Sequence, residues 1–345
     1  MTFCITHTLS QLRHLLRISL AAFALLASLA SSGATPVLRP EIEAFIEEMG
    51  AKHDYQTGLL RRLFAQVQMR PSIIRAMSAP STARPWHEFR QRIVTQSRIE
   101  AGLRFWTQHR VALERASREF GVPEELMVAT IGIETMYGRT MGTFKVIDAL
   151  STLAFDYPPR AEFFRGELEQ YLLLIREAGL DSGTRGSYAG AIGIPQFIPS
   201  SYRKYAIDFD GDGRRDLVNS PADAIGSVAN YYKSFGWRAG EAVTVQAEAG
   251  EADVPALVAA GIRPHSTVSE LRKRGLVVPG PVDDNAEATV LAVETDVGRR
   301  VLLGLNNFYV ITRYNRSVNY AMAVHELSQE MRAQMRGASA GVGAR

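Results

Sequence analysis

One glutamate in this sequence has the surroundings that a proton donor requires. Residues 123–138 read PEELMVATIGIETMYG, and the 100° step of a helix places Glu134 on the same side as Met127 and Ile131. Burial on such an apolar face disfavours the charged carboxylate and raises its pKa, as a general acid at neutral pH requires. The alternative is a partly exposed glutamate near a helix end that pairs with Arg139 or another cation.

A second segment combines glycines with a single amide side chain. Residues 186–202 read GSYAGAIGIPQFIPSSY, in which Gly186, Gly190 and Gly193 allow a ligand or another backbone to approach closely. Gln196 is the only amide side chain of the run. The segment therefore fits a ligand-binding loop, or else a tight packing segment that ends at Pro199.

Aromatic and amide side chains alternate in a third segment, residues 306–324, which reads NNFYVITRYNRSVNYAMAV. Aromatic rings can stack on the apolar faces of a sugar, and amides can bond its hydroxyl and acetamido groups. The residues concerned are Phe308, Tyr309, Tyr314 and Tyr320, with Asn306, Asn307, Asn315 and Asn319. The alternative is an ordinary corner between two elements with tyrosines in the core.

An acidic segment matches the opening of an EF-hand calcium loop. Asp208, Asp210 and Asp212 stand at positions 1, 3 and 5, where oxygen ligands suit a hard cation. Gly213 permits the sharp turn at position 6, and Arg214 would supply its backbone carbonyl at position 7. Position 12 is Asn219 instead of the usual glutamate, while Asp216 and Asp223 lie nearby. The alternative is an acidic turn without an ion.

Helices must position most of these segments. Apolar residues recur at helical spacing in the ranges 40–49, 59–67, 88–120, 123–138, 161–178, 221–235 and 317–335. We expect the range 88–120 to form one or two long helices. Runs of β-branched residues at 243–247, 289–295 and 300–304 predict a small β-rich region at 241–304. The Gly/Ala-rich end after Arg336 predicts a flexible tail.

The amino terminus has the pattern of a secretory signal peptide. Arg13 and Arg17 precede the uncharged apolar run ISLAAFALLASLA at 18–30, and small residues follow up to Ala34. The run is shorter than the roughly 20 residues that span a bilayer. We therefore expect cleavage after residue 34 and export to the periplasm, with a retained membrane anchor as the alternative.

Composition narrows the classes of protein further. The 345 residues are 22% charged and 46% hydrophobic, as in ordinary soluble globular proteins. The net charge of +3 is not a strong basic field, so we expect no nucleic-acid partner. The single cysteine, Cys4, excludes an intramolecular disulfide and a zinc site of several thiolates.

Taken together, the motifs resemble the lytic murein transglycosylase B family, glycoside hydrolase family 103. The motifs are IGIETMYG, YPPRAEFF, GSYAGAIGIPQFIPSSY, DFDGDG with DAIGSVANYY, and NFYVITRYNRSVNYAMAV, in the order of the family. The resemblance covers residues 40–335 and implies a mainly α fold: a lysozyme-like helical core with an additional N-terminal helical domain and a small β-rich insertion.

This resemblance implies the following division of the chain. A signal peptide at 1–34 precedes an N-terminal helical region at 35–120 and a catalytic core with the EF-hand-like loop at 121–240. The β-rich domain at 241–304 is followed by a return to the core at 305–335 and a flexible tail at 336–345.

The resemblance also implies the reaction and its catalytic residue. Glu134 matches the single catalytic acid of the family, which protonates the oxygen of the β-1,4 bond between N-acetylmuramic acid and N-acetylglucosamine. The muramoyl 6-hydroxyl then attacks the anomeric carbon while Glu134 acts as base, and a 1,6-anhydromuramoyl end results. This differs from the two-carboxylate scheme of most glycosidases.

Other family positions match residues of a substrate cleft. The matching residues are Phe89, Arg160, Ser187, Gln196, Tyr231, Tyr314, Asn315 and Tyr320. Phe89 stands where some members carry tyrosine, and Pro159 replaces what is often a second basic residue. For calcium, the resemblance implies Asp208, Asp210, Asp212 and Asp223 as side-chain ligands, with the carbonyl of Arg214. The loop is one residue longer before Asp223 than is usual in the family.

We expect a monomer that acts on peptidoglycan strands without an organic cofactor, and cell-wall synthesis proteins are candidate partners. Two alternative functions remain open at this stage. A lysozyme-like hydrolase would use water in place of the 6-hydroxyl. A non-catalytic scaffold would bind the wall without cleaving it.

Overall fold

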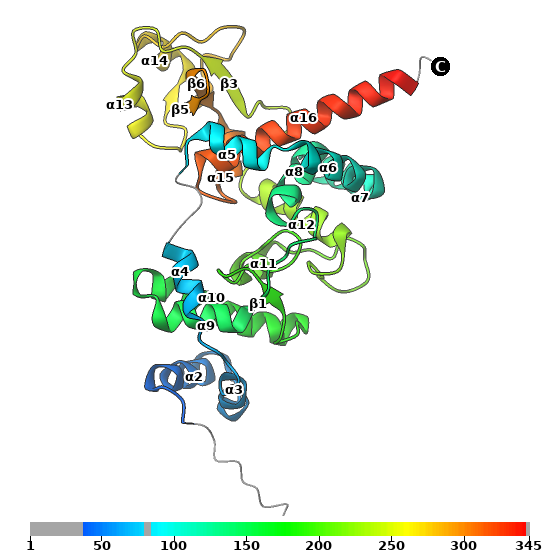
Figure 1. The fold of residues 1–345 in the computed structure, drawn as a ribbon, viewed down its shortest axis with the longest axis vertical. Helices are drawn as coiled ribbons and strands as arrows, with labels where there is room; N and C mark the ends of the chain where they lie inside the picture. Colours follow the sequence, from blue (N-terminus) through cyan, green and yellow to red (C-terminus); the bar gives the residue numbers. More distant parts are fainter. Residues whose placement is uncertain (1–36, 79–83, 343–345) are drawn as a thin grey trace, which may run out of the picture. The chain divides into compact units, whose positions relative to one another are not determined.

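The computed structural model describes residues 37–78 and 84–342, which are drawn in colour in Figure 1. The predicted signal peptide, with Cys4, lies outside the described residues. The described chain forms two compact units, which meet in sequence between Gln66 and Val67.

The first unit is a pair of helices, α2 (Pro40–His53) and α3 (Thr57–Phe64). Phe45 and Phe64 meet edge to face with their ring centroids 5.9 Å apart. Asp54 takes a left-handed conformation with φ 56°, which ends α2 and turns the chain toward α3.

The second unit begins with α4 (Pro71–Ser78), which packs against α9 (Val146–Asp156). The backbone N–H of Gln68 donates to Asp148, and the backbone N–H of Arg70 donates to Thr152, at 3.0 and 2.9 Å. Because both acceptors are buried side chains of α9, the segment before α4 is tied to that helix.

Helices build most of this unit. They are α5 (Trp86–Ile93), α6 (Gln96–Gln108), α7 (Arg110–Phe120), α8 (Glu124–Thr135), α10 (Ala161–Ala178), α11 (Pro199–Tyr205), α12 (Pro221–Ser234), α15 (Asn306–Thr312) and α16 (Val318–Val342). A short 3₁₀ helix, η1 (Pro158–Arg160), precedes α10. The helix α8 is buried along most of its length and packs against α6, α7, α12 and α16.

The range 88–120 forms three helices where the periodicity predicts one or two. The first break follows Ile93, where the Thr95 side chain accepts a hydrogen bond from the Arg98 N–H and so caps a new helix. The second break is at His109, whose φ of −110° interrupts the regular helix geometry. Apolar spacing alone did not reveal these interruptions because it continues across them.

Two small sheets complete the unit. Strand β1 (Phe144–Lys145) pairs antiparallel with β2 (Arg185–Gly186), directly before the glycine-rich segment. The second sheet has the order β3-β6-β5-β4, with β3 (Thr244–Ala247), β4 (Ser266–Thr267), β5 (Glu287–Thr295) and β6 (Gly298–Gly304). These strands lie within the range 241–304 that the sequence predicts to be β-rich.

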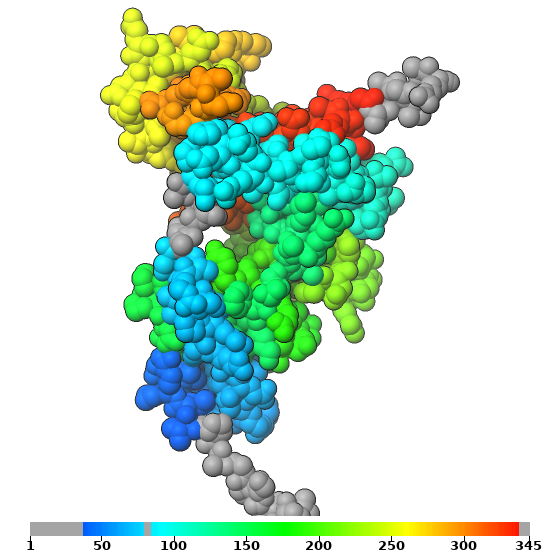
Figure 2. All heavy atoms as spheres, viewed as in Figure 1, coloured from blue at the N-terminus to red at the C-terminus, as the bar shows by residue number. Residues whose placement is uncertain are grey.

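The four-stranded sheet has its own hydrophobic core. Val290, Val301 and Leu303 pack with Leu257 of α13 (Val254–Ala259) and Leu271 of α14 (Val268–Lys273). A neighbouring helix, α5, contacts β5. In the space-filling view of Figure 2, the cyan atoms of the α5 region adjoin the yellow and orange atoms of the sheet region.

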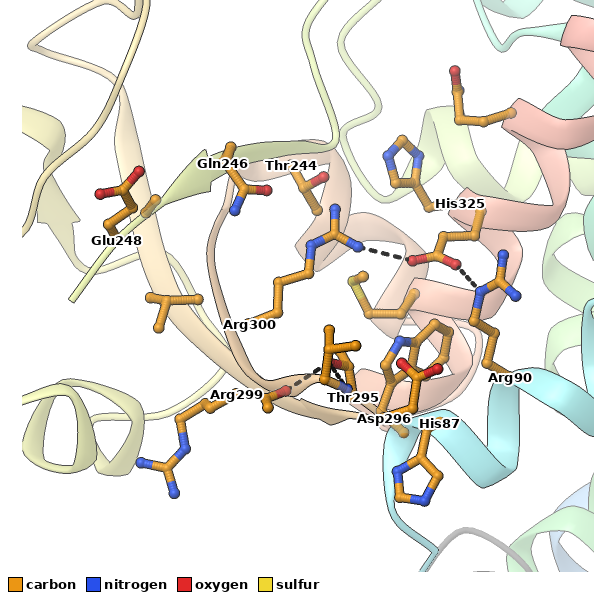
Figure 3. Close-up of a pocket in the computed structure, with 18 of the residues that line it drawn as sticks. His87, Arg90, Thr244, Gln246, Glu248, Thr295, Asp296, Arg299, Arg300 and His325 are labelled. Atoms are coloured by element: carbon orange, nitrogen blue, oxygen red, sulfur yellow. Dashed lines mark hydrogen bonds and ion pairs between the residues drawn. The ribbon is translucent and has the colours of Figure 1, made fainter.

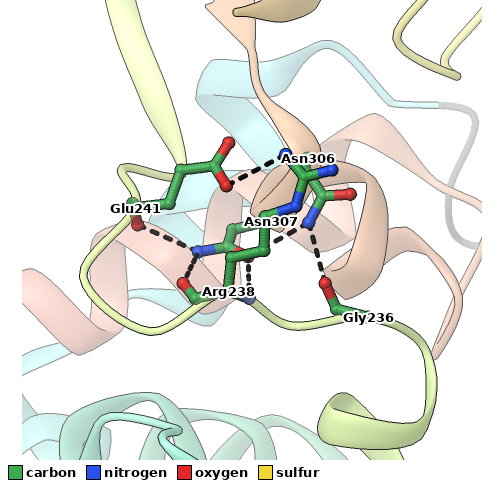
Figure 4. A network of polar contacts seen from close by, with 5 residues as sticks. All are labelled: Gly236, Arg238, Glu241, Asn306 and Asn307. Atoms are coloured by element: carbon green, nitrogen blue, oxygen red, sulfur yellow. Dashed lines mark hydrogen bonds and ion pairs between the residues drawn. The ribbon is translucent and has the colours of Figure 1, made fainter.

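A polar network joins the sheet region to the helices (Figure 4). The amide of Asn307 donates to the carbonyls of Arg238 and Glu241, at 2.8 and 2.9 Å, and accepts from the N–H of Arg238 at 2.9 Å. Asn307 is fully buried at the start of α15. The Asn307 side chain thus joins two segments. One is the segment of Arg238 and Glu241, which leads to β3, and the other is the start of α15, which follows β6.

The mainly α class that we expected is confirmed. The composition after Arg336 predicts a flexible tail, but α16 continues through these residues to Val342. Among the described residues, no helix has both the length and the apolar character needed to span a membrane.

Candidate active site

Glu134 lies in the last turn of α8 and is half-buried. Burial raises the pKa of its carboxyl to about 7, and a hydrogen bond from Tyr320 opposes this shift. The Tyr320 hydroxyl donates to Glu134 Oε1 at 2.5 Å. A carboxyl with a pKa raised toward neutral pH can give up a proton and later take one back, which is the chemistry of a general acid and base.

Tyrosines from three segments surround this carboxyl. The ring of Tyr320 stacks on that of Tyr314 with centroids 6.4 Å apart and an interplanar angle of 15°. Tyr314 also contacts Tyr231 and Tyr232, at 4.8 and 5.8 Å between centroids. The structure therefore brings together Glu134 and three of the predicted substrate residues, Tyr231, Tyr314 and Tyr320.

Hydrogen bonds fix the hydroxyl of each of these rings. Tyr314 donates to the Pro195 carbonyl at 2.5 Å, and Tyr231 donates to the Arg313 carbonyl at 2.6 Å. Tyr232 shares a hydrogen bond of 2.7 Å with Thr130, which lies one turn before Glu134 on α8. Because buried hydroxyls are costly to leave unpaired, these contacts hold the rings in single orientations.

Sequence reasoning missed Tyr232 as a member of this cluster. Its signal was present in the sequence, because it directly follows Tyr231 in VANYY, and Thr130 stands on the same face of α8 as Glu134.

A left-handed turn follows α8. Met136, Tyr137 and Gly138 have φ values of 51°, 63° and 83°. The Tyr137 hydroxyl donates to the carbonyl of Arg98 at 2.9 Å, and its ring lies over Gly132. Such φ values are unfavourable for residues other than glycine. The contacts of Tyr137 hold Met136 and Tyr137 in this left-handed conformation.

Gly132 is required by this turn. A Cβ added to Gly132 would lie 2.4 Å from the Tyr137 hydroxyl oxygen. The Arg98 side chain donates to the Gly132 carbonyl from Nε at 3.2 Å. Tyr137 and Arg98 thus support the turn that follows Glu134, and neither was among the predicted site residues.

The glycine-rich segment forms a loop beside the tyrosines. Phe197 of this loop contacts Tyr231 and Tyr314, at 5.4 and 5.8 Å between ring centroids. Gln196 has a φ of 52°, and its amide nitrogen donates to the carbonyls of Gly193 and Met141 at 2.8 and 3.2 Å. These bonds fix the Gln196 side chain next to the cluster.

Ser187 opens the same loop. Its hydroxyl oxygen accepts the N–H groups of Ala189 and Ala191, at 3.2 and 3.0 Å. In this state the Ser187 side chain shapes the loop, and it is partly exposed.

Three predicted substrate residues make no described contact with Glu134 or the tyrosines. Phe89 is buried and stacks on Trp86 at 6.4 Å. Arg160 is exposed, with its guanidinium 4.3 Å from the centroid of the Phe163 ring. Asn315 is exposed next to Tyr314.

The acidic segment folds into a loop that gathers three carboxylates. One oxygen each from Asp208, Asp210 and Asp212 lies within 4.8 Å of the others. The Asp208 oxygens accept the N–H groups of Gly211 and Gly213 at 2.7 and 2.8 Å. Oxygen donors at this spacing fit a hard cation such as Ca²⁺.

Asp223 does not join this group. Its Oδ1 accepts the N–H of Phe209 at 2.7 Å, and its Oδ2 accepts the N–H of Asp216 at 2.8 Å. The carboxylate is fully buried and bonds both ends of the loop. Ser220, which sequence reasoning did not select, contacts the group directly, because its hydroxyl bonds Asp210 Oδ2 at 2.6 Å.

Comparison with known proteins places these features in a family. Residues 38–329 match the family model described as the transglycosylase SLT domain. The chain is 41% identical to the membrane-bound lytic murein transglycosylase B of Escherichia coli (strain K12) over 301 residues, which cover 84% of this chain and 82% of that relative.

Solved structures match over most of the chain. The catenated lytic transglycosylase SltB1 from Pseudomonas aeruginosa is 45% identical, with a TM-score of 0.83 and coverage of 86% of this chain and 98% of that one. The Escherichia coli lytic transglycosylase Slt35 in complex with calcium is 40% identical, with a TM-score of 0.78 and coverage of 86% and 93%.

A more distant structure contains a bound ligand. SltB3 from Pseudomonas aeruginosa, in complex with NAG-anhNAM-pentapeptide, is 30% identical with a TM-score of 0.74, and the match covers 84% of this chain and 78% of that one. The structural matches confirm the lysozyme-like fold that the resemblance implied.

Proposed function

Because this chain belongs to the transglycosylase SLT domain family, we propose that it is an exported lytic transglycosylase that cleaves peptidoglycan. The bond cleaved is the β-1,4 bond between N-acetylmuramic acid and N-acetylglucosamine. The product carries a 1,6-anhydromuramoyl end. The observation that carries this proposal is the Glu134 carboxyl in the hydrogen bond from Tyr320, beside a cluster of packed tyrosines.

Glu134 serves both proton transfers in turn. Its protonated carboxyl gives a proton to the glycosidic oxygen, and the bond from that oxygen to the anomeric carbon breaks. The muramoyl 6-hydroxyl oxygen forms a bond to that carbon, and its proton passes to the Glu134 carboxylate. The acid is thereby restored and no water is consumed.

The side chains around Glu134 have distinct roles in this proposal. Tyr320 orients the carboxyl through its hydrogen bond, and the rings of Tyr314 and Tyr231 form an aromatic wall for sugar rings. Gln196 and Ser187 lie on the loop beside this wall and meet the sugar near the bond cleaved. Phe89, Arg160 and Asn315 contact more distant parts of the strand, with Arg160 directed at carboxylates of the peptide stems.

The acidic loop holds a structural calcium ion in this proposal. Asp208, Asp210 and Asp212 bind it together with the carbonyl of Arg214, and Asp223 keeps the two ends of the loop together. Bound calcium would supply positive charge that offsets the repulsion among these carboxylates. A relative whose structure holds calcium supports this assignment.

The proposed setting is the periplasm, reached through the signal peptide at 1–34. We propose a monomer, with wall-synthesis proteins as candidate partners. A relative in complex with NAG-anhNAM-pentapeptide supports peptide-bearing glycan as the substrate.

The test is mass spectrometry of the soluble products from purified peptidoglycan. We expect anhydro products, lighter by one water than hydrolytic products, and a loss of activity of about 10²–10⁴-fold for Glu134→Gln. An amide cannot donate the proton, although it preserves the size of the side chain. Products with reducing ends would show a hydrolase instead, and full activity of Glu134→Gln would refute the assignment of the acid.

A further inference from the structure

The four-stranded sheet has an open edge at β3. In the described residues, β3 is an edge strand of this sheet, whose strand order is β3-β6-β5-β4. The Val243 carbonyl accepts a hydrogen bond from the N–H of Leu305, which follows β6. Because backbone groups alternate in direction along a strand, the N–H and C=O of Thr244 and Gln246 face away from β6.

Glu248 is the next residue whose backbone faces away from β6, and it pairs with another segment of the chain. Glu248 donates to the Val277 carbonyl at 2.8 Å and accepts the Val277 N–H at 3.0 Å. Continued antiparallel pairing would place Pro279 opposite Gln246 and Pro281 opposite Thr244. Proline has no N–H to donate, so this segment of the chain cannot extend the ladder and the edge stays open.

The edge is acidic. Residues 239–262 contain Glu241, Glu248, Glu251 and Asp253, but no lysine or arginine. Glu241 pairs with Arg238. No cation lies within ion-pair distance of Glu248 among the residues that the structure describes. A partner that pairs with this edge is therefore favoured if it carries positive charge.

A cavity of about 930 Å³ lies beside this edge (Figure 3). Thr244 and Gln246 line it together with α5, α16 and the turn between β5 and β6. Figure 3 shows both side chains pointing from β3 to the side where Arg300 lies. Asp296, at the turn, lines the same cavity and has no ion-pair partner among the described residues. Neither Glu134 nor its tyrosines line this cavity.

The three arginines that line the cavity are already in ion pairs, and Arg299 binds Glu294 at 2.9 Å. Glu326 binds Arg90 at 2.6 Å and Arg300 at 3.2 Å, as the dashed lines in Figure 3 show. The aromatic ring of Trp86, which lines the cavity, is only 3% exposed. With no exposed aromatic platform and with unpaired acids at its rim, the cavity suits a basic peptide better than a sugar.

We propose that the outer edge of β3 binds an extended, basic segment of a partner protein as an added strand. Thr244 and Gln246 exchange backbone hydrogen bonds with this strand. Its alternate side chains project on the same face as those of Thr244 and Gln246, toward the cavity, with lysine or arginine near Glu248 and Asp296. A second copy of this chain fits poorly, because pairing two such edges would bring like charges together.

The experiment measures the fluorescence anisotropy of a labelled synthetic heptapeptide, in which lysine alternates with valine and threonine, against the purified protein. Saturable binding is expected at low ionic strength and should weaken as salt rises. Gln246→Pro removes an N–H that faces away from β6, and we expect it to weaken binding at least about tenfold. Gln246→Ala keeps the N–H and is the matched control, with an expected change below about twofold.

Two peptide controls keep the test independent of protein folding. A heptapeptide N-methylated at the amides of one edge cannot form the ladder, and one with glutamate in place of lysine has the wrong charge. Both should bind at least about tenfold more weakly. Glu248→Lys should weaken binding of the original peptide, and a thermal melt checks that each variant is folded.

Several outcomes would overturn the proposal. These are no saturable binding at millimolar peptide, or equal binding of the N-methylated peptide. Equal binding to folded Gln246→Pro would also overturn it. Competition by a disaccharide-pentapeptide of peptidoglycan would assign the cavity to substrate. A dimer in sedimentation that is lost in Gln246→Pro would assign the edge to a second copy.

Discussion

Two features of its position raise the pKa of Glu134, and a third opposes them. Burial disfavours the carboxylate, and the position in the last turn of α8 adds the negative end of the helix dipole. The hydrogen bond from Tyr320 favours the carboxylate and so lowers the pKa. The balance leaves a pKa of about 7, close to the pH of a neutral environment.

This balance predicts the pH dependence of activity. The free enzyme must hold the proton, so kcat/KM should be level at low pH and fall about tenfold per pH unit above about 7. Because only one carboxyl takes part in this proposal, kcat/KM should not fall again at acid pH until the protein unfolds. The measurement is initial rates on soluble glycan strands across the pH range.

Tyr320→Phe is the control for this assignment. It removes the hydrogen bond that lowers the pKa of Glu134, so the decline should move to higher pH, while kcat falls because the carboxyl loses its orientation. A decline at unchanged pH in Tyr320→Phe would show that another group controls the profile.

At this scale the sequence revealed residues whose chemistry is visible in their type and spacing. Glu134 and Tyr320 lie in distinctive motifs, and the structure joins them by a hydrogen bond. Tyr137 and Arg98 act through backbone carbonyls. A hydrophobic pattern does not predict such contacts, because every residue type has a backbone carbonyl that can accept a hydrogen bond.

At the scale of elements, the end of α8 depends on close packing. Gly132 has the Tyr137 ring against it, and Gly102 of α6 has the same hydroxyl 2.4 Å from an added Cβ. Two glycines thus make room for one aromatic side chain beneath the turn that follows Glu134. The packing of α6 on α8 and the position of Glu134 are therefore linked.

Gly132→Ala should destabilise the protein by about 1–3 kcal/mol and lower kcat, because the new methyl group must displace the Tyr137 ring. Gly166→Ala is the matched control within the exposed surface of α10, where an added Cβ meets nothing within 4 Å. This control should be stabilised by up to about 1 kcal/mol. Urea unfolding and initial rates measure both effects. Equal stability of the two variants would contradict the packing argument.

The acidic loop is an element whose two ends meet at Asp223. Three carboxylates lie close together on an exposed loop, and their mutual repulsion would be relieved by a divalent cation. The sequence predicted an EF-hand calcium loop that opens with these three aspartates; the structure gathers their carboxylates, and calcium binding stays a prediction. The backbone N–H groups that bond Asp223 were not predictable from the spacing.

Chelation should therefore lower the melting temperature more than it changes the bond that is cleaved. For an ion present at about 100 times its Kd, the loss is about 2.7 kcal/mol, or about 5 °C. Asp212→Asn should remove most of this response to chelator. Asp181→Asn, in another exposed loop where the aspartate accepts the Gly183 N–H, should keep it. A melting curve unchanged by chelator would count against a bound ion.

At the scale of the whole molecule, residues from Val67 onward form one compact unit, although the sheet has its own core. The sequence located β3, β5 and β6 because β-branched runs interrupt the helical spacing, but it did not predict the two-residue strands β1, β2 and β4. It predicted the return of the chain to the core near residue 305. It did not reveal how the junction is held. The division into domains at residue 120 stays a prediction.

Asn307 is the residue on which this junction depends. Asn307→Ala would leave two carbonyls and one N–H without their partner in a buried place, which should cost about 3 kcal/mol. Asn306→Ala is the control, because Asn306 bonds the Gly236 carbonyl from a more exposed position and should cost about 0.5–1 kcal/mol.

Urea unfolding followed by circular dichroism measures both variants. Because Asn307 joins the exit from the helices to the return after β6, its loss should weaken the coupling of the sheet region to the helices as well as the total stability. We therefore expect one transition for the unmodified protein and for Asn306→Ala, but a broader or divided transition for Asn307→Ala. A single sharp transition in Asn307→Ala at unchanged slope would show that the apolar contacts of α5 and α15 with the sheet are sufficient to couple the two regions.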